Sequence, residues 1–568
     1  MSGNVIFTVS ANCRDCYRCL RNCPVKAIRV SGGQAQIDDS LCIQCGTCVR
    51  ECPQNAKKIR SDLEAVKELV KSKPVAASVA PSFAAVYSGQ LTSRLPSALR
   101  QLGFKHITET SEGAKYITEK SFEQGQSGNI CSTCPAVVNY IEKYEPGLLD
   151  YLIPVASPMI AHGRILKARH PDCAVVFIGP CAAKIGEALR PDAIGSVDYV
   201  LTFDELDQWM LDEGISLNYC PESGFDSSGS IGNARLFPLD GGMLATGGID
   251  SELSSKDTLF IHGANAVLDL FQDKKTIGSL KYIETLFCNG GCIGGPGIST
   301  KKSLFERRRD VLSYWENTVT SDVEETPEIA YIAEYSIKTP SFDEVTESQI
   351  SDVLAQTGKS DPALQLNCNA CGYKTCIDCA VAIVRGIAEP EMCMPYMKRL
   401  AQQRTDRIIE TTPSGIVVLN SDLFMIHFNP AFQNMFKLSS GMLGRRISVL
   451  LDAEGYELMQ TSSADEFQSI KNNNGTRYHE VLYALRDENQ YVGIYTDISK
   501  LEMTEEHLSI VKAQTVYHAR EFLEHQIRFS QEMAHFLGQS TAKSEEIARR
   551  LISLYEQDEN HEDTGGFI

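Results

Sequence analysis

The sequence predicts a multidomain protein of the α/β class, in which α+β modules follow one another along 568 residues. Two observations carry this prediction. The 20 cysteines fall into groups before residue 394, and none occurs from 394 to 568. Apolar strand-like runs such as residues 174–179 end directly at a cysteine loop, as expected where a site lies at the carboxyl ends of a parallel sheet. A chain of this length is expected to form several domains and to bury a sizeable core.

Residues 1–60 contain two cysteine runs with identical spacing, each closed by a proline. The runs are Cys13, Cys16, Cys19, Cys23 and Cys42, Cys45, Cys48, Cys52. They resemble bacterial ferredoxins with two 4Fe-4S clusters, in which the fourth cysteine of each run binds the other cluster. The resemblance implies that Cys52 completes the first cluster and Cys23 the second. A zinc site would favour paired two-by-two spacing, usually with a histidine, and neither occurs here.

Residues 70–300 carry three further cysteine loops. Their sequences are Ile-Cys-Ser-Thr-Cys-Pro-Ala at 130–136, Gly-Pro-Cys-Ala-Ala-Lys-Ile-Gly-Glu at 179–187 and Glu-Thr-Leu-Phe-Cys-Asn-Gly-Gly-Cys-Ile-Gly-Gly at 284–295. Four thiolates from distant segments suit a 4Fe-4S cubane, and a helix starting at residue 135 would direct its amino-terminal amides at an anionic cluster. The alternative is that Cys134 and Cys181 are ordinary buried thiols, while Cys288 and Cys292 form half of a zinc site.

The three loops resemble the signature segments of iron-iron hydrogenases, which hold the H-cluster. The resemblance implies that Cys134, Cys181, Cys288 and Cys292 bind its cubane. It further implies that Cys292 bridges to a two-iron subsite carrying CO, CN and a bridging dithiolate. Lys184 would direct its charge at the cyanide ligands, since a buried lysine without an anionic partner is costly. Ala80, Pro81 and Ser82 match the family segment beside the subsite.

Several positions depart from the family pattern. Thr133 stands where catalytic members usually have a proton-shuttling cysteine, and a hydroxyl is a far weaker acid than a thiol. Gly179, Leu286 and Met159 replace two methionines and a glutamine around the subsite. Because groups around a metal site tune its reactivity, we expect a site that binds H2 but turns it over slowly.

Three other side chains near these loops could take part in proton transfer. Cys131 could replace the missing thiol, although packing within the loop explains it as well. Glu119 and Glu123 could belong to a proton path, but exposed surface positions are the simpler interpretation.

Residues 301–345 show little pattern and are interpreted as a linker. Residues 346–400 contain five cysteines, and the spacing of four of them resembles the small 4Fe-4S domain of electron-transfer and corrinoid iron-sulfur proteins, which implies the ligands Cys368, Cys371, Cys376 and Cys393. Zinc is an alternative for such compact spacing. Cys379 has no role in the pattern and is interpreted as a buried neighbour. Residues 346–357 are predicted to form a short amphipathic helix before this domain.

Residues 405–500 resemble a PAS domain, with a small α/β sensor-like domain as the alternative. Residues 412–419 and the Asn-Pro-Ala-Phe segment at 429–432 predict strand, turn, strand and short helix, and 492–498 predict the last strand. His427 is interpreted as structural and not as a ligand.

Residues 501–568 are interpreted as a helical signalling segment followed by an acidic tail. The apolar residues on one predicted helix face are Phe522, Phe529, Met533 and Phe536. This face could pair with a partner helix, so that the PAS domain and the helix would form a homodimer, or it could pack on the PAS domain of its own chain.

The bulk composition limits the partners and the compartment. A net charge of −19 argues against nucleic-acid binding. There is no apolar run of membrane-spanning length, and residues 1–10 lack the features of a signal peptide. Grouped cysteines fit clusters better than the disulfides of secreted proteins. We therefore expect a cytoplasmic protein of an anaerobe, with no membrane or nucleic-acid partner.

The order of the domains resembles that of the sensory iron-iron hydrogenases. The resemblance implies a hydrogen or redox sensor that exchanges electrons with a ferredoxin or another redox protein and needs the hydrogenase maturation proteins. No kinase or phosphatase domain follows the PAS domain, so a separate downstream signalling protein would carry the signal. The first alternative is a ferredoxin-dependent catalytic hydrogenase. The second is a non-catalytic iron-sulfur electron-transfer or scaffold protein without the two-iron subsite.

Overall fold

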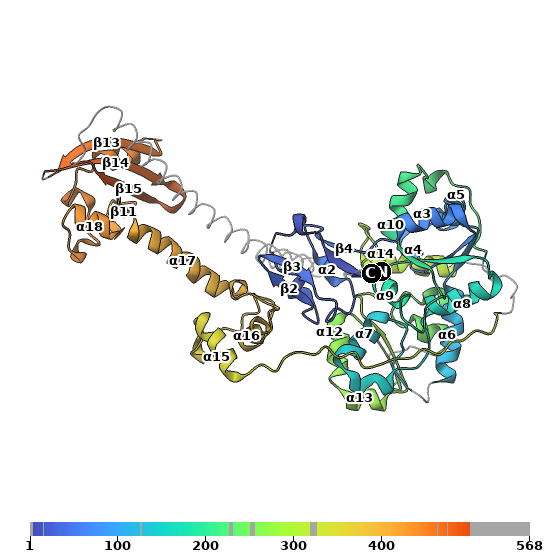
Figure 1. Cartoon of the computed structure of the whole chain (residues 1–568). Helices are drawn as coiled ribbons and strands as arrows, with labels where there is room; N and C mark the ends of the chain where they lie inside the picture. The colour runs from blue at the N-terminus through green and yellow to red at the C-terminus, as the bar shows by residue number, and fades with distance from the viewer. Residues whose placement is uncertain are drawn as a thin grey trace, which may run out of the picture. The chain divides into compact units, whose positions relative to one another are not determined.

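The computed structural model describes residues 4–14, 16–124, 128–226, 231–249, 256–317, 326–462, 464–473 and 475–499. The chain forms two compact units, Met1–Met397 and Lys398–Ile568, and Figure 1 shows their elements. None of the helices in the described ranges is both long and apolar enough to cross a membrane. The predicted signalling segment, 501–568, lies outside the described residues.

The first unit begins with the two cysteine runs, which fold as a repeat. Its elements are β1 (Ile6–Thr8), α1 (Arg18–Asn22), β2 (Ile28–Ser31), β3 (Gln34–Ile37), α2 (Thr47–Glu51) and β4 (Lys57–Ile59). β1 pairs antiparallel with β4, and β2 with β3. The N–H of Ala27 donates to Cys23 Sγ at 3.3 Å, and the N–H of Ala56 donates to Cys52 Sγ at 3.2 Å. The two halves therefore share local geometry as well as spacing, and we call them the ferredoxin module.

A larger body follows, built on a parallel sheet with the strand order β6-β5-β7-β8. Its strands are β5 (Val75–Val79), β6 (His106–Glu109), β7 (Ala174–Gly179), β8 (Tyr199–Thr202), β9 (Thr258–His262) and β10 (Tyr282–Leu286). Its helices are α3 (Leu63–Ser72), α4 (Phe83–Val86), α5 (Gln90–Gln101), α6 (Ser111–Glu123), α7 (Pro135–Tyr144), α8 (Pro158–Arg169), α9 (Ala183–Glu187), α10 (Phe203–Asp212), α11 (Gly242–Thr246), α12 (Ala264–Phe271), α13 (Lys274–Ser279) and α14 (Leu304–Glu316). β5 and β7 are buried along their whole length, as strands covered on both faces must be.

A second, smaller parallel pair joins β9 to β10. Ile130 extends it through bridges to Ile283 and Leu152. The strand predicted at 174–179 and the helix predicted from 135 are both confirmed, as β7 and α7. Because Cys181 follows β7 and Cys288 follows β10, the cysteine loops leave the carboxyl ends of parallel strands, as the sequence predicted.

Residues 301–345, interpreted from the sequence as a linker, contain α14 and an extended segment that is bound to the body. We call residues 329–338 the strap. Tyr331 O accepts from the N–H of Ala156 at 2.7 Å, and the Tyr335 hydroxyl donates to Val155 O at 3.0 Å. The N–H of Lys338 donates to Glu142 O at 2.8 Å. The strap therefore belongs structurally to the body.

A small helical domain follows the strap and packs against the ferredoxin module. Its main helices are α15 (Glu347–Gln356) and α16 (Cys376–Val384), and α15 confirms the helix predicted at 346–357. The N–H of Val30 donates to Ile387 O at 2.9 Å, and the N–H of Gly32 donates to Glu389 Oε1 at 2.7 Å. Gly372 has φ +93° and lies against the backbone of Arg21, so only glycine suits this contact.

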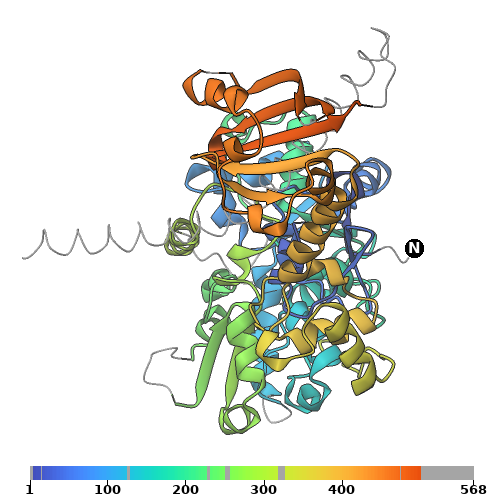
Figure 2. The same cartoon turned by 90° about the vertical axis from the view of Figure 1, so that its left-hand side faces the viewer.

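The second unit is an antiparallel five-stranded sheet with helices, seen in orange to red in Figure 2. The strand order is β12-β11-β15-β14-β13. Its elements are β11 (Gly415–Asn420), β12 (Met425–Phe428), α18 (Pro430–Met435), α19 (Glu454–Thr461), β13 (Glu466–Asn473), β14 (Thr476–Leu485) and β15 (Gln490–Asp497). The helix α17 (Met394–Thr411) starts directly after Cys393 and leads into it. The predicted strand, turn, strand and short helix are confirmed.

Asn429 fixes α17 to this sheet. Its side chain accepts from the N–H groups of Ile416 at 2.7 Å and Phe432 at 2.9 Å, and donates to Ile409 O at 2.8 Å and Ser414 O at 2.9 Å. One buried amide thus satisfies four backbone groups from α17, β11, α18 and the bend before β11, which explains the Asn-Pro segment noted in the sequence.

Candidate metal centre and electron relay

The four loop cysteines of the body lie close enough for their charges to interact. Burial raises the pKa of Cys181 to about 11, and the charge of Cys134 adds to the rise. Burial also raises the pKa of Cys288 and of Cys292, with further contributions from Cys134 and Cys181. Four thiolates in one place repel one another, so they need a cationic partner such as iron.

Glycines allow the third loop to pack against its neighbours. A Cβ on Gly295 would lie 2.5 Å from Pro180 O in the second loop, and one on Gly291, at φ +79°, would lie 2.6 Å from Pro238 O. Real Cβ atoms do not approach this closely, so the glycines around Cys292 are required for the loops to meet.

Lys184 is buried beside this centre and already has a carboxylate partner. Its Nζ lies 2.8 Å from Glu187 Oε2 and 3.5 Å from the carbonyl oxygen of Thr133. The burial of Lys184 therefore does not by itself require anionic cyanide ligands, which removes one argument made from the sequence. The missed partner had a signal, since Glu187 stands three residues after Lys184 on the same helix.

Within the described part of the chain, buried hydroxyls without a hydrogen-bond partner occur in the body. Three of them belong to Ser82, directly before α4, to Thr133 in the first loop and to Ser157, directly before α8. Buried hydroxyls are normally satisfied, so orphaned ones indicate a place for a polar group that the protein does not supply. The donor set of four thiols, an ammonium and free hydroxyls fits an anionic iron-sulfur group with polar ligands.

At the three positions where the sequence differs from the hydrogenase pattern, Gly179, Met159 and Leu286, neighbouring side chains keep the centre enclosed. A Cβ on Gly179 would lie 2.5 Å from the ring of Phe177 and 3.1 Å from Ala80 Cβ. Phe177 therefore occupies the space where a methionine side chain would start. Met159 and Leu286 are buried, so all three changes alter the packing around the centre and leave it enclosed.

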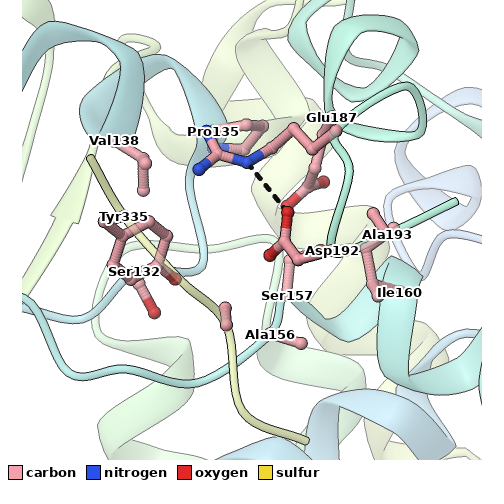
Figure 3. Close-up of a pocket in the computed structure, with 12 residues that line it drawn as sticks. Ser132, Pro135, Val138, Ala156, Ser157, Ile160, Glu187, Asp192, Ala193 and Tyr335 are labelled. Carbon is pink, nitrogen blue, oxygen red and sulfur yellow. Dashed lines mark ion pairs between the residues drawn. The ribbon is translucent and has the colours of Figure 1, made fainter. Parts of the chain in front are cut away.

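A pocket of about 330 Å³ lies beside the first loop. Figure 3 shows Ser132 and Tyr335 on one side of it and Asp192, Ala193 and Ile160 on the other. Glu187 also lines the pocket, which places the partner of Lys184 at its wall. Tyr335 comes from the strap, so the strap closes one side of this pocket.

Cys131 and Glu284 form a second buried titratable group near the third loop. Cys131 is fully buried. Burial raises the pKa of its thiol well above the ordinary value, and the charge of Glu284 adds to the rise. Burial raises the pKa of Glu284 to about 8, although its carboxyl accepts from the N–H of Leu244 at 3.2 Å. Both groups are therefore held in their neutral forms near neutral pH.

The ferredoxin cysteines interact across the two runs. Burial raises the pKa of Cys23 to about 11, and the next contribution is the charge of Cys45 from the other run. Burial raises the pKa of Cys42 to about 12, with Cys23 among the contributors. These contacts support the grouping of Cys23 with Cys42, Cys45 and Cys48. The matching placement of Cys52 with the first run stays a prediction.

The second ferredoxin run adjoins the centre of the body. Burial raises the pKa of Cys45, and the charge of Cys134 in the first loop contributes to the rise. Arg50 donates to Gly294 O in the third loop at 2.7 Å and lowers the pKa of both Cys45 and Cys288. Arg50 therefore stands between the two cysteine groups, a position that sequence reasoning missed.

The small domain gathers its predicted ligands around a pocket of about 240 Å³. The lining cysteines are Cys368, Cys371, Cys376 and Cys393. Cys379, interpreted as a neighbour, forms a thiol hydrogen bond with Cys371 that lowers the pKa of Cys371. Burial raises the pKa of Tyr373, and the charges of Cys371 and Cys23 add to the rise. This pocket therefore adjoins the ferredoxin module.

Zinc binds its sulfur ligands at about 2.3 Å and so draws them tightly together. Within the described ranges, no three cysteine, histidine, aspartate or glutamate side chains are arranged to hold one metal ion. All twenty cysteines are free thiols. Glu119, Glu123 and His427 are exposed and lie outside these groups.

Comparison with protein families agrees with the geometry. Residues 73–296 match the iron-only hydrogenase large subunit, C-terminal domain, and residues 12–56 match a 4Fe-4S dicluster domain. Residues 365–395 match a putative Fe-S cluster family, and residues 403–471 match a PAS domain. The fold and the site therefore define an iron-sulfur protein that carries an iron-only hydrogenase domain and a PAS domain.

Individual relatives fall into two kinds. The chain is 28% identical over 265 residues to the NADP-reducing hydrogenase subunit HndD of Solidesulfovibrio fructosivorans, covering 36% of this chain and 45% of that protein. It is 26% identical over 276 residues to iron hydrogenase 1 of Clostridium pasteurianum, covering 39% and 48%. It is also 38% identical over 117 residues to the cytosolic Fe-S cluster assembly factor NAR1 of Eremothecium gossypii, covering 20% and 25%.

The chain thus spans less than half of the length of each of these relatives. Among solved structures, the FeFe-hydrogenase HydA1 of Chlamydomonas reinhardtii aligns with 50% of this chain and all of its own, at 17% identity and a TM-score of 0.37.

Proposed function

We propose that this protein is a hydrogen-responsive iron-sulfur protein. In this proposal it binds H2 at an H-cluster, oxidises H2 or reduces protons slowly, and passes electrons through 4Fe-4S clusters. The PAS domain would then signal to a separate effector protein. The observation that supports this most directly is the convergence of Cys134, Cys181, Cys288 and Cys292 beside the second ferredoxin run.

Each side chain has a definite role in the proposal. The four loop cysteines would hold the cubane, and Cys292 would also connect it to the two-iron subsite. When bound, the two-iron group would supply the reversible cleavage of H2. Lys184, held by Glu187, would direct its ammonium at the subsite, and Ala80, Pro81 and Ser82 would line it. Thr133 Oγ1, free of other partners, would hold or pass the proton, slowly because a hydroxyl is a weak acid.

The remaining clusters would carry the electrons. The second ferredoxin group adjoins the loop cysteines through Cys45, and the small domain adjoins the ferredoxin module through Tyr373. A ferredoxin or another redox protein would exchange electrons with this relay, and maturation proteins would insert the two-iron subsite. Cys393 directly precedes α17, which leads into the PAS domain. A change at the last cluster could therefore reach that domain along the chain.

Infrared spectroscopy of the anaerobically matured full-length protein tests this function. We expect carbonyl and cyanide bands that shift reversibly with H2, together with low turnover. In Thr133→Cys the same bands should persist while turnover rises at least tenfold, because the thiol restores an acid of suitable pKa. Equal turnover in the two proteins would contradict the proton-transfer argument. High turnover of the unaltered protein would instead favour a ferredoxin-dependent catalytic hydrogenase.

The second candidate function is a role in Fe-S cluster assembly without H2 chemistry. It is favoured by the similarity to the assembly factor NAR1 and by the Lys184–Glu187 pair, which satisfies the buried lysine without a two-iron subsite. Matured protein that contains cubanes but shows no carbonyl or cyanide bands, and that delivers a cluster to an acceptor apoprotein, would support this candidate and exclude the first.

A further inference from the structure

Lys359 is a buried cation without a carboxylate partner. Lys359 is only 8% exposed, and none of the ion pairs among the described residues includes it. Its own N–H donates to Leu354 O at 2.6 Å, and Gln365 Nε2 donates to Lys359 O at 3.1 Å. These contacts fix the backbone of Lys359 between α15 and the cysteine loop.

The ammonium of Lys359 faces thiols. Nζ lies 3.3 Å from Cys376 Sγ, and it also hydrogen-bonds Cys393. Lys359 lines the same pocket as the four predicted ligands of the small domain. A buried ammonium is costly unless an anion compensates it. Cysteine thiolates around an iron-sulfur cluster would provide that anion.

The hydrogen-bond donors are distributed unevenly around this pocket. Lys359 donates hydrogen bonds to Cys376 and Cys393, and the Cys379 thiol donates one to Cys371. Cys368 is exposed at the surface. Lys26 of the ferredoxin module interacts with the charge of Cys371, but its ammonium donates to the carbonyl oxygens of Leu20 and Arg21 at 3.1 Å each. Among the described residues, Lys359 is therefore the cation whose ammonium hydrogen-bonds the sulfurs of predicted ligands.

We propose that Lys359 is a positioning residue that raises the reduction potential of the cluster in the small domain, and so makes this cluster the electron-accepting end of the relay. Reduction adds one electron to a cluster that is already anionic. A fixed positive charge and hydrogen bonds to the sulfurs stabilise the reduced state more than the oxidised one. The inference rests on the proposed function only in naming the cluster as an electron acceptor.

The test is a potentiometric titration followed by electron paramagnetic resonance. It uses the full-length protein reconstituted with 4Fe-4S clusters but without the two-iron subsite, so that its failure is distinct from a failure of the proposed function. The Cys393→Ala variant identifies the signal of this cluster by removing it. Lys359→Met removes the charge at similar length, and Lys359→Arg keeps it. Lys374→Met, at an exposed lysine of the same domain, is the matched control.

We expect Lys359→Met to disfavour reduction of this cluster at least tenfold, which for one electron is a shift of about 59 mV to lower potential. In Lys359→Arg and Lys374→Met, the reduction potential of this cluster should shift by less than this amount. An unchanged potential in Lys359→Met would overturn the proposal. If that variant loses the cluster, Lys359→Gln is measured in its place. Loss of the cluster in both neutral variants would also overturn it, because Lys359 would then act in holding the cluster.

Discussion

At the scale of single residues, Glu284 gives this protein an unusual dependence of stability on pH. Burial raises its pKa from the ordinary value near 4.5 to about 8. The charged or titratable groups that face it are Cys131, Asp240 and Cys292, and backbone N–H groups of Gly241, Met243 and Leu244 point at its carboxyl. Between pH 4.5 and 8 the folded protein keeps a proton on Glu284 that the unfolded chain has released. The contribution of Glu284 to stability is therefore lost as the pH rises.

The Glu284→Gln variant should remove this dependence. Gln carries no titratable proton, so the difference in melting temperature between pH 6 and pH 8.5 should be smaller in the variant than in the unaltered protein. Anaerobic thermal unfolding at the two pH values measures it. If the unaltered protein is as stable at pH 8.5 as at pH 6, Glu284 does not retain its proton in the fold.

Single residues were predicted from the sequence only where a spaced motif contained them. The loop cysteines and Lys184 belong to such motifs, and the structure places them together. Lys359 belongs to none, and the motifs that contain Arg50 and Glu284 assign them no role, because these roles come from contacts between segments that are distant in sequence. Lys359 precedes its partner Cys376 by 17 residues, and Arg50 reaches Gly294 across 244 residues.

At the scale of elements, the contact between the ferredoxin module and the third loop depends on Gly46. This residue precedes α2 at φ +73°, and a Cβ there would lie 2.6 Å from Pro296 Cβ. Proline is rigid and cannot move aside easily, so the two segments can meet only while residue 46 lacks a side chain.

Gly46→Ala should therefore destabilise the protein more than a left-handed backbone alone would. Gly214→Ala is the matched control, since Gly214 has φ +69° and nothing within 4 Å of the added Cβ. Left-handed backbone costs about 1–2 kcal/mol in both variants, and overpacking adds about 1–3 kcal/mol in Gly46→Ala. Chemical unfolding under anaerobic conditions compares them. Equal losses in the two variants would show that the contact with Pro296 is not tight.

Elements with local signals were predicted well. The helix predicted at 346–357 has a capping box of Thr346 and Gln349, and α18 starts behind the Asn-Pro segment. The helix α14 and the strap were not predicted, although α14 has its own capping box from Ser303 and Glu306. The strap has neither helical nor strand periodicity, because its order comes from partners such as Val155 and Glu142.

At the scale of the whole molecule, the cysteine groups form a connected series from the body, through the ferredoxin module, to the small domain. Cys134 adjoins Cys45, and Cys23 adjoins the small domain through Tyr373. Electrons released by H2 would thus have one continuous route to the cluster beside Lys359. Sequence motifs predicted the cysteine groups but could not predict which groups would adjoin, since that depends on the packing of whole modules.

Removing the second ferredoxin cluster should cut the small-domain cluster off from the body. In Cys42→Ala, which removes a ligand of the second ferredoxin cluster, we expect H2 to alter the infrared bands as before. It should no longer reduce the small-domain cluster, as measured by electron paramagnetic resonance. Cys173→Ala, at a buried cysteine outside the groups, should leave both responses intact. Undiminished reduction in Cys42→Ala would mean that electrons bypass this cluster.

The strap has a practical consequence for dissecting the protein. Family similarity to hydrogenases ends at residue 296, yet Lys338 Nζ lies 2.8 Å from the buried Glu142, whose carboxylate also binds Arg190. A fragment excised at residue 296 would lose this lysine and the Tyr335 wall of the pocket, and would expose apolar surface to solvent. The smallest fragment expected to fold as an intact hydrogenase-like body therefore extends to Lys338, about forty residues beyond the border that similarity alone would suggest.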